Sequence, residues 1–316
     1  MRAPDFWKSR GVLATLLSPL GVLYGASVAL KAHFARSYDC GLPVICVGNL
    51  TAGGSGKTPI AIAIANMLRA RGRKPFFLTR GYGGSERGPA LVARAHSADL
   101  MGDEALLLVR AAPTIVARDR TTGARLATEK GADVLVMDDG HQNFSLRKSL
   151  SLVVVDAGTG FGNGHLIPAG PLREPVARGL ARADAVVLAG DGNPDLQGYA
   201  GPVLRARLLL DAGALAGKSV FAFAGIGRPE KFIASLEAEG VEVAGSCFFD
   251  DHHPYTEDEI MQLKAIAGDT MLVTTEKDFV RLSVAQREGI RAVKAVSVFD
   301  DAAALEALLD RAVARV

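Results

Sequence analysis

The sequence predicts an α/β protein in which a mostly parallel β-sheet is covered by helices on both faces. Short apolar runs rich in β-branched residues recur without polar alternation, as expected for strands that are buried on both faces. Helical stretches at 60–71 and 104–110 lie between several of these runs, and such alternation is typical of parallel sheets. The predicted strands are 44–47, 76–78, 134–137, 152–155 and 186–188.

A second group of elements in the last third of the chain predicts a smaller α/β domain. The expected strands are 219–223, 242–244 and 271–274, and the expected helices are 229–239 and 256–267.

The length of 316 residues suits two domains. The stretch 191–201 is rich in Gly, Pro and Asp and is the expected transition between them. The sequence therefore predicts an N-terminal helical segment at 1–37, a core domain at 38–200 and a smaller domain at 201–316.

Composition excludes several classes of protein. Hydrophobic residues make up 49% of the chain and the formal net charge is +2, so the chain is not intrinsically disordered. No long Lys/Arg cluster marks a nucleic-acid binder, and we expect no nucleic-acid partner. Cys40, Cys46 and Cys247 form no CxxC pair, which favours a reducing, cytoplasmic compartment over a disulfide framework. No pattern in the sequence indicates an obligate protein partner.

Residues 11–30 form an uncharged apolar segment that is long enough to cross a bilayer. The segment lacks the cleavage pattern of a signal peptide. Pro19 and Gly21 interrupt it, and basic residues flank both ends, so the flanks give no orientation signal. We expect a membrane-associated helix that lies in the cytoplasmic leaflet. A transmembrane span and a helix buried in a soluble core are the alternatives.

A glycine-rich turn gives the strongest chemical signal. Residues 48–59, GNLTAGGSGKTP, follow an expected strand and precede an apolar-periodic helix, which is the context that a phosphate-binding loop requires. Lys57 would neutralise the β- and γ-phosphates, and Thr58 would place its hydroxyl on Mg²⁺. The strict pattern GxxxxGK[ST] has glycine where this chain has Thr51. The residues expected to contact the nucleotide are Thr51, Ala52, Gly53, Gly54, Ser55, Gly56, Lys57 and Thr58.

Two carboxylates end the expected strand 134–137. Asp138 and Asp139 would lie at the sheet edge where open α/β sheets bind ligands, which is where a phosphate-binding loop needs an acidic partner for magnesium. Neighbouring side chains on a strand point to opposite faces, so both can serve the metal only if the chain turns there, which Gly140 permits. An acidic turn without a ligand is the alternative.

Two pairs of adjacent charged residues are weaker candidates for site residues. Asp103 and Glu104 open an expected helix, where N-capping by Asp103 would explain its presence without catalysis. Arg173 and Glu174 lie in a proline-flanked loop, where a surface ion pair is the alternative to a role at the site.

Two further groups have equally plain structural alternatives. Arg118 and Arg120 follow a β-like segment and would either offset phosphate charge or lie in solvent. The run DDHHPY at 250–255 precedes a helix whose expected N-cap is Thr256. A histidine beside carboxylates can be a base, a metal ligand or a loop residue.

The ordered motifs, taken jointly, are specific. They are GNLTAGGSGKTP at 48–59, RGYGG at 80–84, GDE at 102–104, DDGHQ at 138–142, PLRE at 171–174, DHH at 251–253 and TEKD at 275–278. This set resembles the tetraacyldisaccharide 4'-kinase family, the lipid A kinases. The resemblance runs from the N-terminal helix to about residue 282, and Thr51 in place of the P-loop glycine is part of the family pattern.

The resemblance implies a kinase with a P-loop NTPase-like core. Such an enzyme transfers the γ-phosphate of ATP to the 4'-hydroxyl of a tetraacylated glucosamine disaccharide 1-phosphate in lipid A biosynthesis. ATP and Mg²⁺ are the implied cofactors, and the acylated disaccharide lipid and the membrane surface are the implied partners. The implied location is the cytoplasmic face of the inner membrane of a Gram-negative bacterium, in a peripheral or monotopic arrangement.

The resemblance also implies catalytic roles. Lys57 would act on ATP, and Asp103 would take the proton of the sugar hydroxyl. His252 of the second domain would pair with Asp103, with His253 as the alternative partner.

The remaining implied roles concern charge. The residues near the metal would be Thr58, Glu104, Asp138 and Asp139, and those near substrate or nucleotide phosphates would be Arg120, Arg173 and Glu174. Asn143 stands where many members have histidine, so no role is carried over to that position.

Two rival functions come from other classes. A P-loop GTPase usually carries a guanine-reading motif of the form [NT]KxD, and Thr275, Glu276, Lys277 and Asp278 have these letters in the wrong spacing. A membrane-anchored scaffold without turnover would leave Asp103 and His252 dispensable. We expect adenine specificity and ATP consumption that depends on the lipid acceptor.

Overall fold

The predicted apolar runs form the centre of one mixed, 12-stranded sheet in the computed structural model, which describes residues 4–314. The strand order is β10-β9-β11-β12-β8-β7-β6-β1-β5-β2-β4-β3. The outer residues of two predicted segments, 1–3 of 1–37 and 315–316 of 201–316, lie outside the described residues.

One half of the sheet, with the helices around it, is called the core lobe here. Its strands are β1 (Val44–Gly48), β2 (Pro75–Thr79), β3 (Ala90–Leu91), β4 (Thr114–Val116), β5 (Val134–Asp138), β6 (Leu150–Asp156) and β7 (Ala185–Ala189). Its helices are α2 (Lys57–Ala70), α3 (Ala98–Met101), α4 (Asp103–Leu108), α5 (Arg120–Glu129), α6 (Val176–Leu180) and α10 (Ala302–Val313). All pairings among these strands are parallel except that of β3 with β4.

The other half is the small lobe. It contains β9 (Ser219–Ala224), β10 (Glu242–Phe248), β11 (Met271–Thr275), α7 (Pro229–Ala238), α8 (Glu257–Ala267), α9 (Glu276–Phe279) and the short 3₁₀ helix η2 (Gly213–Leu215), whose Leu215 packs in its apolar cluster. A second 3₁₀ helix, η1 (Asp5–Trp7), precedes α1. The predicted strands and helices of both lobes are confirmed, with shifted ends.

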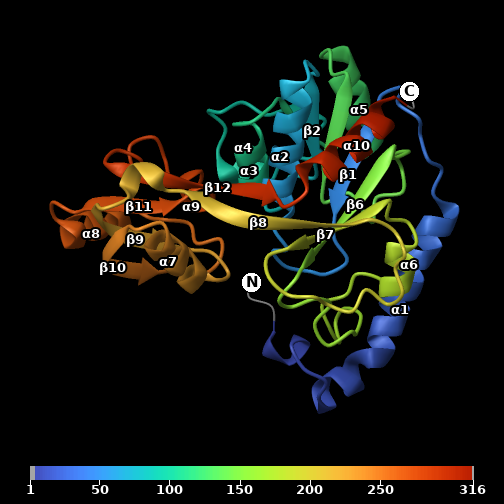
Figure 1. Ribbon diagram of the computed structural model, residues 1–316, viewed down its shortest axis with the longest axis horizontal. Coiled ribbons are helices and arrows are strands. Elements are labelled where there is room, and N and C mark those ends of the chain that lie inside the picture. The colour runs from blue at the N-terminus through green and yellow to red at the C-terminus, as the bar shows by residue number, and fades with distance from the viewer. Residues whose placement is uncertain (1–3, 315–316) are drawn as a thin grey trace.

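Two long strands join the lobes. β8 (Val203–Asp211) and β12 (Ile290–Phe299) pair antiparallel and run from one lobe into the other, as Figure 1 shows. Neither strand was predicted, and β8 is exposed at many positions instead of being uniformly buried.

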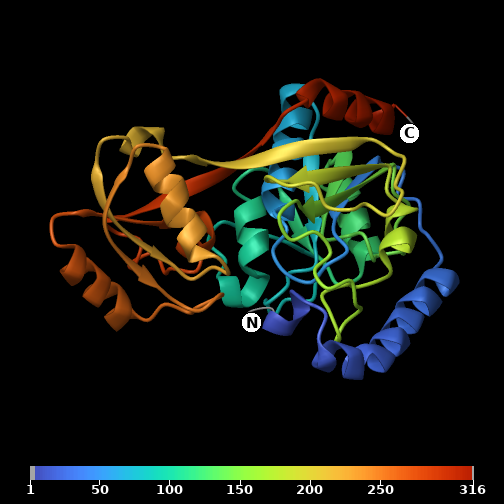
Figure 2. The same ribbon diagram turned by 60° about the horizontal axis from the view of Figure 1, so that its bottom comes forward.

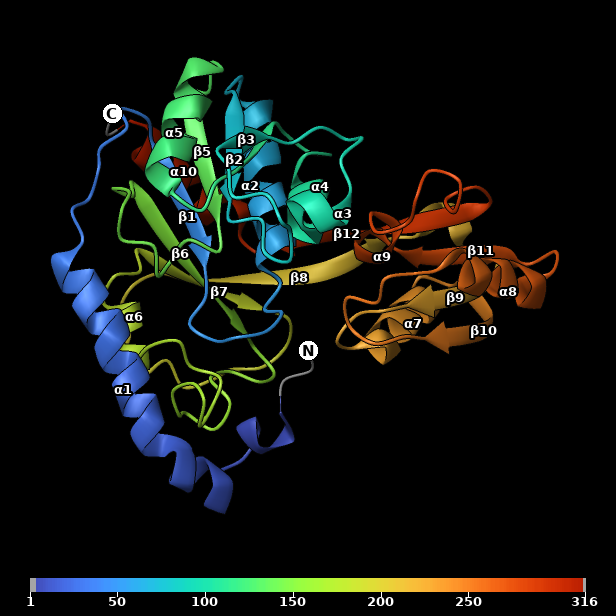
Figure 3. The same cartoon turned by 180° about the vertical axis from the view of Figure 1, so that it is seen from behind.

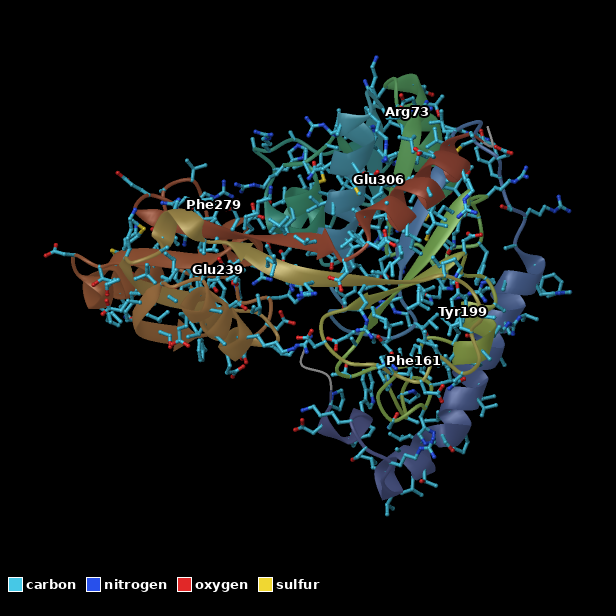
Figure 4. The ribbon with its side chains drawn as sticks, in the orientation of Figure 1. Arg73, Phe161, Tyr199, Glu239, Phe279 and Glu306 are labelled. Atoms are coloured by element: carbon cyan, nitrogen blue, oxygen red, sulfur yellow. The ribbon has the colours of Figure 1, made fainter. Side chains whose placement is uncertain are left out.

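The C-terminal helix returns to the core lobe. Leu305, Leu308 and Leu309 of α10 pack in the same apolar cluster as Ile45 of β1. Glu306, labelled in Figure 4, forms an ion pair with Arg71 at 2.9 Å. The predicted boundary near residue 200 stays a prediction, and by its packing α10 is part of the core lobe.

The long helix α1 (Val12–Phe34) lies along the outside of the core lobe, as Figures 2 and 3 show. It is the one helix among residues 4–314 that is long and apolar enough to cross a membrane. Only Ala14 and Gly21 within it are buried, so the interpretation as a buried core helix is wrong. An added Cβ at Gly21 or Gly25 would meet Leu166, so small residues let the helix approach the core lobe closely.

Candidate active site

The loop between β1 and α2 has the backbone of a phosphate-binding turn. Gly56 has φ +80°, a left-handed conformation that glycine adopts without strain, and it directly precedes the first turn of α2. The buried amide of Asn49 holds the loop by donating to Thr51 O at 2.7 Å and to Ser55 Oγ at 3.1 Å. Ala52 N donates to Pro171 O at 2.7 Å, which ties this loop to the PLRE motif.

Lys57 begins α2 and lies within a cluster of opposite charges. Its Nζ is 3.6 Å from Asp139 Oδ1, and Arg173 Nη1 donates to the same oxygen at 2.8 Å. Burial raises the pKa of the Asp139 carboxyl, but the charges of Lys57 and Arg173 outweigh burial and hold that pKa below its usual range. The loop lysine, the acidic motif and the PLRE arginine therefore meet in one place.

The chain turns between the two carboxylates, as the sequence analysis required. β5 ends at Asp138, and Asp139 itself adopts the left-handed conformation with φ +52°. Asp138 is fully buried, and its Oδ2 accepts a hydrogen bond of 3.1 Å from the Thr58 hydroxyl. Burial, with the nearby Glu104 carboxylate, raises the pKa of Asp138.

These oxygen atoms suit a magnesium ion. Asp138 Oδ1 is buried and has no hydrogen-bond partner among residues 4–314, and the Thr58 hydroxyl lies beside the other oxygen of the same carboxylate. The described residues contain no group of three His, Cys, Asp or Glu side chains placed to bind a metal by themselves. Mg²⁺ is commonly held by one or two carboxylates together with substrate phosphates, so the residues present fit this ion.

Asp103 meets His252 across the two lobes. Asp103 is the first residue of α4 in the core lobe, and His252 follows β10 in the small lobe. His252 Nδ1 lies 2.8 Å from Asp103 Oδ2. The N-cap of α4 is Gly102, and Asp103 is the first residue inside the helix, so the N-cap interpretation of Asp103 is wrong.

Gly102 positions this carboxylate. It has φ +86°, and an added Cβ would overlap the Tyr82 carbonyl of the RGYGG motif. Only glycine fits this close approach, so residues 80–84 and 102 together fix where α4 and Asp103 begin.

His253 points elsewhere. Its Nε2 lies 2.9 Å from Glu259 Oε1, and its ring stacks on Phe249 with centroids 4.7 Å apart. Glu259 and Thr256 form a capping box at the start of α8, as the predicted N-cap requires. His253 thus belongs to the helix start, and His252 is the histidine that faces Asp103.

The other predicted charged residues are spread around this site. Arg120 is 3% exposed and donates to Ala117 O. Burial, then the positive charge of Arg80, lowers the pKa of Arg120 to about 10. Glu174 is buried and accepts two 2.8 Å hydrogen bonds from Arg182. Arg173 and Glu174 therefore do not pair with each other.

The histidine of the acidic motif has a structural role. His141 is 1% exposed, and its ring nitrogens lie 3.1 Å from Ser151 Oγ and 3.0 Å from Gly179 O. Burial lowers its pKa to about 3. Asn143 Oδ1 accepts hydrogen bonds from the Ser145 backbone and hydroxyl, which stabilises a turn.

Arg281 is a further residue of the site that was not predicted from the sequence. Its Nε donates to Asp103 Oδ2 at 2.7 Å, and its side chain is 4% exposed. The signal in the sequence was spacing, because Arg281 stands three residues after Asp278 of the TEKD motif. In the structure the two side chains form an ion pair of 2.9 Å.

The chain matches a known protein family over most of its length. The model of the LpxK family, tetraacyldisaccharide-1-P 4'-kinase, matches residues 13–314. The chain belongs to this family. The tetraacyldisaccharide 4'-kinase of Paramagnetospirillum magneticum is 49% identical over 320 residues, which cover 98% of each chain. That of Methylobacterium sp. (strain 4-46) is 51% identical over 324 residues, which cover 98% of this chain and 97% of the relative.

A solved LpxK structure has a similar fold. It is the "apo" form of LpxK from Aquifex aeolicus in complex with ATP, with a TM-score of 0.79 and 26% identity. The match covers 96% of this chain and 100% of that chain. Family membership and the α/β fold that the motifs implied are therefore confirmed for this LpxK family member.

Proposed function

We propose that this chain transfers the γ-phosphate of ATP to the 4'-hydroxyl of a tetraacylated glucosamine disaccharide 1-phosphate, the lipid A biosynthesis step for which its family is named. The observation that carries the proposal is the meeting of Lys57, Asp139 and Arg173 beside the phosphate-binding loop. The electrostatic effect of Glu104 on Asp138 supports including the adjoining residue Asp103 in the same site.

The loop at 48–59 binds the triphosphate in this proposal. Backbone N–H groups of residues 53–56 and the N-terminus of α2 surround phosphate oxygens, and Lys57 neutralises the β- and γ-phosphates. The ATP complex of the Aquifex aeolicus relative supports ATP as the nucleotide. Asp139 holds Lys57 and Arg173 on one oxygen, so that both cations face the same anion.

Thr58 and Asp138 would hold Mg²⁺, with Glu104 and Asp139 close by. The ion, when bound, neutralises charge that develops on the transferred phosphoryl group. Arg120 adds a buried positive charge near the same carboxylates. Glu174 fixes Gln142 and Arg182 and so supports the loop that carries Arg173.

Asp103 accepts the proton of the 4'-hydroxyl as its oxygen attacks the γ-phosphorus. A bond forms between that oxygen and phosphorus, the bond from phosphorus to the β,γ-bridging oxygen breaks, and ADP leaves. His252 holds Asp103 in place and supplies a route for the proton. Because the two residues come from different lobes, closing of the lobes would complete the site around the bound ligands.

The outer face of α1 supports a monotopic position on the cytoplasmic face of the inner membrane of a Gram-negative bacterium. Large exposed apolar side chains recur at spacings of three, four or seven residues and so share one face. They are Val12, Leu16, Leu20, Leu23, Leu30 and Phe34, and the exposed side chains of Leu13 and Val22 flank them. Because Gly21 and Gly25 hold the opposite face against Leu166, the helix lies along the protein while this stripe enters the leaflet.

Phosphorylation with labelled ATP and detergent-solubilised tetraacyldisaccharide 1-phosphate tests the proposal. The wild type should transfer phosphate only when the lipid is present and should prefer ATP to GTP. Lys57→Met should lose at least about 100-fold in turnover. Exposed Asp99→Ala is the matched control for an acidic side chain near Asp103 and should retain activity. Equal ATP hydrolysis with and without the lipid would contradict a kinase.

A further inference from the structure

Arg281 contacts both members of the Asp103–His252 pair. It follows α9 in the small lobe and is 4% exposed. Its Nε donates to Asp103 Oδ2 at 2.7 Å, and its Nη2 lies 3.4 Å from His252 Nδ1. A nearly buried guanidinium is therefore in direct contact with the proposed proton acceptor.

The small lobe fixes this guanidinium from behind. Arg281 Nη1 donates to Asp278 Oδ1 and to Gly225 O, both at 2.9 Å. Asp278 is fully buried and also accepts hydrogen bonds from Tyr255 Oη at 2.9 Å and from Gly225 N at 3.0 Å. Its Oδ2 accepts a 2.6 Å hydrogen bond from Thr275 Oγ1. With so many fixed partners, Arg281 presents its Nε in one direction.

The contacts of Asp103 are asymmetric. His252 and Arg281 both bind Oδ2, and within residues 4–314 no hydrogen bond is recorded to Oδ1. A carboxylate that is held by one oxygen presents the other to an incoming hydroxyl, which is the geometry that a proton acceptor needs.

We propose that Arg281 is a positioning residue for phosphoryl transfer: it holds Oδ2 of Asp103 so that Oδ1 faces the acceptor hydroxyl. This inference rests on the proposed function. It gives the TEKD motif a role, because Asp278 of that motif is the partner that orients Arg281.

The charges around Asp103 agree with this role. Burial raises the pKa of Asp103, but the hydrogen bond from His252 and the charge and hydrogen bond of Arg281 outweigh burial, so the pKa lies below its usual value. The other charged groups are Glu104 beside Asp103, Asp278 behind Arg281, and Lys277 and Asp251 beside His252, with Lys277 Nζ 3.3 Å from Asp251 Oδ1 and from His252 Nε2.

A contact that only joins the two lobes, without touching Asp103, provides the comparison for Arg281. The ion pair of Arg228 with Asp156 also joins the small lobe to the core lobe, at 2.6 Å, and has no recorded contact with Asp103 within the described residues. Arg228→Met therefore removes another arginine–carboxylate contact between the lobes, one whose arginine is 46% exposed, and serves as the control for Arg281→Met.

The test is the effect on kcat and on KM separately, measured on the full chain in detergent with labelled ATP and the lipid acceptor. Arg281→Met should lower kcat by about 10- to 100-fold, with KM for ATP unchanged, since the P-loop is untouched. Arg281→Lys should restore part of kcat, because it retains the charge.

A double-variant cycle separates positioning from folding. In an Asp103→Ala background, Arg281→Met should cause no further loss, because its effect passes through Asp103. A further loss there, a wild-type kcat in Arg281→Met, or an equal loss of kcat in Arg228→Met would each overturn the role of Arg281. If Arg281→Met does not fold, Arg281→Lys carries the test: a wild-type kcat in that variant, whose amine cannot donate from the Nε position, would overturn the inference. A wild-type chain without transfer would instead overturn the proposed function.

Discussion

Asp103 and His252 are 149 positions apart in the sequence, yet His252 Nδ1 lies 2.8 Å from Asp103 Oδ2. Asp103 begins a helix of the core lobe, and His252 sits in a small-lobe loop with φ +64°, a left-handed backbone that is uncommon for a histidine. Backbone strain of this kind often occurs at functional sites because the surrounding structure holds it there. The pair therefore joins the two lobes at one carboxylate.

The first prediction is that Asp103 and His252 act as a unit. Asp103→Ala and His252→Ala should each lower kcat by about 100- to 10,000-fold, the range for loss of acid–base assistance. The double variant should be little slower than the poorer single variant, because residues acting together are not additive. Steady-state transfer assays measure all three. If the fold loss in kcat of the double variant equals the product of the two single losses, the two side chains act independently. His253→Gln, which changes the neighbouring histidine at the α8 cap, is the control.

The second prediction concerns Gly225, which supports both His252 and Arg281. Its carbonyl accepts from His252 N at 3.2 Å and from Arg281 Nη1 at 2.9 Å. A Cβ at this position would lie 2.8 Å from the Tyr255 hydroxyl and 3.0 Å from Asp250 O.

Gly225→Ala should therefore destabilise the fold by about 1–3 kcal/mol, because overpacking a close contact displaces its neighbours. Denaturant unfolding provides the measurement. Gly213→Ala is the matched control, since a Cβ there meets nothing within 4 Å. Equal free energies of unfolding for the two variants would show that the neighbours of Gly225 can move aside without loss of stability.

The third prediction is a loss of stability in mild acid because of His141. In the unfolded chain a histidine titrates near 6.5, whereas burial lowers the pKa of His141 to about 3 in the folded state. Between these values the unfolded state binds the additional proton, so the stability present above pH 6.5 is lost as the pH falls towards 3.

The loss at pH 5 should be about 2 kcal/mol from this residue. Denaturant unfolding of the wild type and of His141→Gln between pH 5 and 8 tests it. The variant should show a shallower pH dependence, whereas His96→Gln should follow the wild type. Parallel curves for His141→Gln and the wild type would assign the acid sensitivity to other groups.

The fourth prediction concerns the exposed stripe of α1. Leu16 and Leu23 are 70% and 67% exposed and share one face of the helix. Placing glutamate at both positions should sharply reduce sedimentation with vesicles of anionic phospholipid, because charge does not enter the acyl boundary. Ile266→Glu on α8 is the control, since this apolar side chain is 66% exposed in the small lobe. Equal vesicle binding by all three proteins would place the membrane contact elsewhere.

Local patterns were sufficient to predict the central strands and the phosphate-binding loop. Val44, Val134 and Leu152 lie in strands that are buried on both faces. Because such strands are apolar throughout, their composition alone was sufficient to predict them. The half-exposed β8 and the returning helix α10 were not predicted, because their partners are distant in sequence. The choice between His252 and His253 was likewise open from sequence, since adjacent histidines differ only in what each one contacts.

The sequence by itself determined the chemistry that this chain carries: a glycine loop ahead of Lys57, carboxylates at the end of a strand, and motifs specific enough to indicate the family. Only the tertiary structure decided which carboxylate meets which base, that Arg281 lies against Asp103, and that α1 lies along the core lobe. The physical reason is that phosphate binding by a loop depends on backbone and side chains that are adjacent in the chain. Orientation of a proton acceptor depends on contacts between two lobes, and no local pattern in the sequence records those contacts.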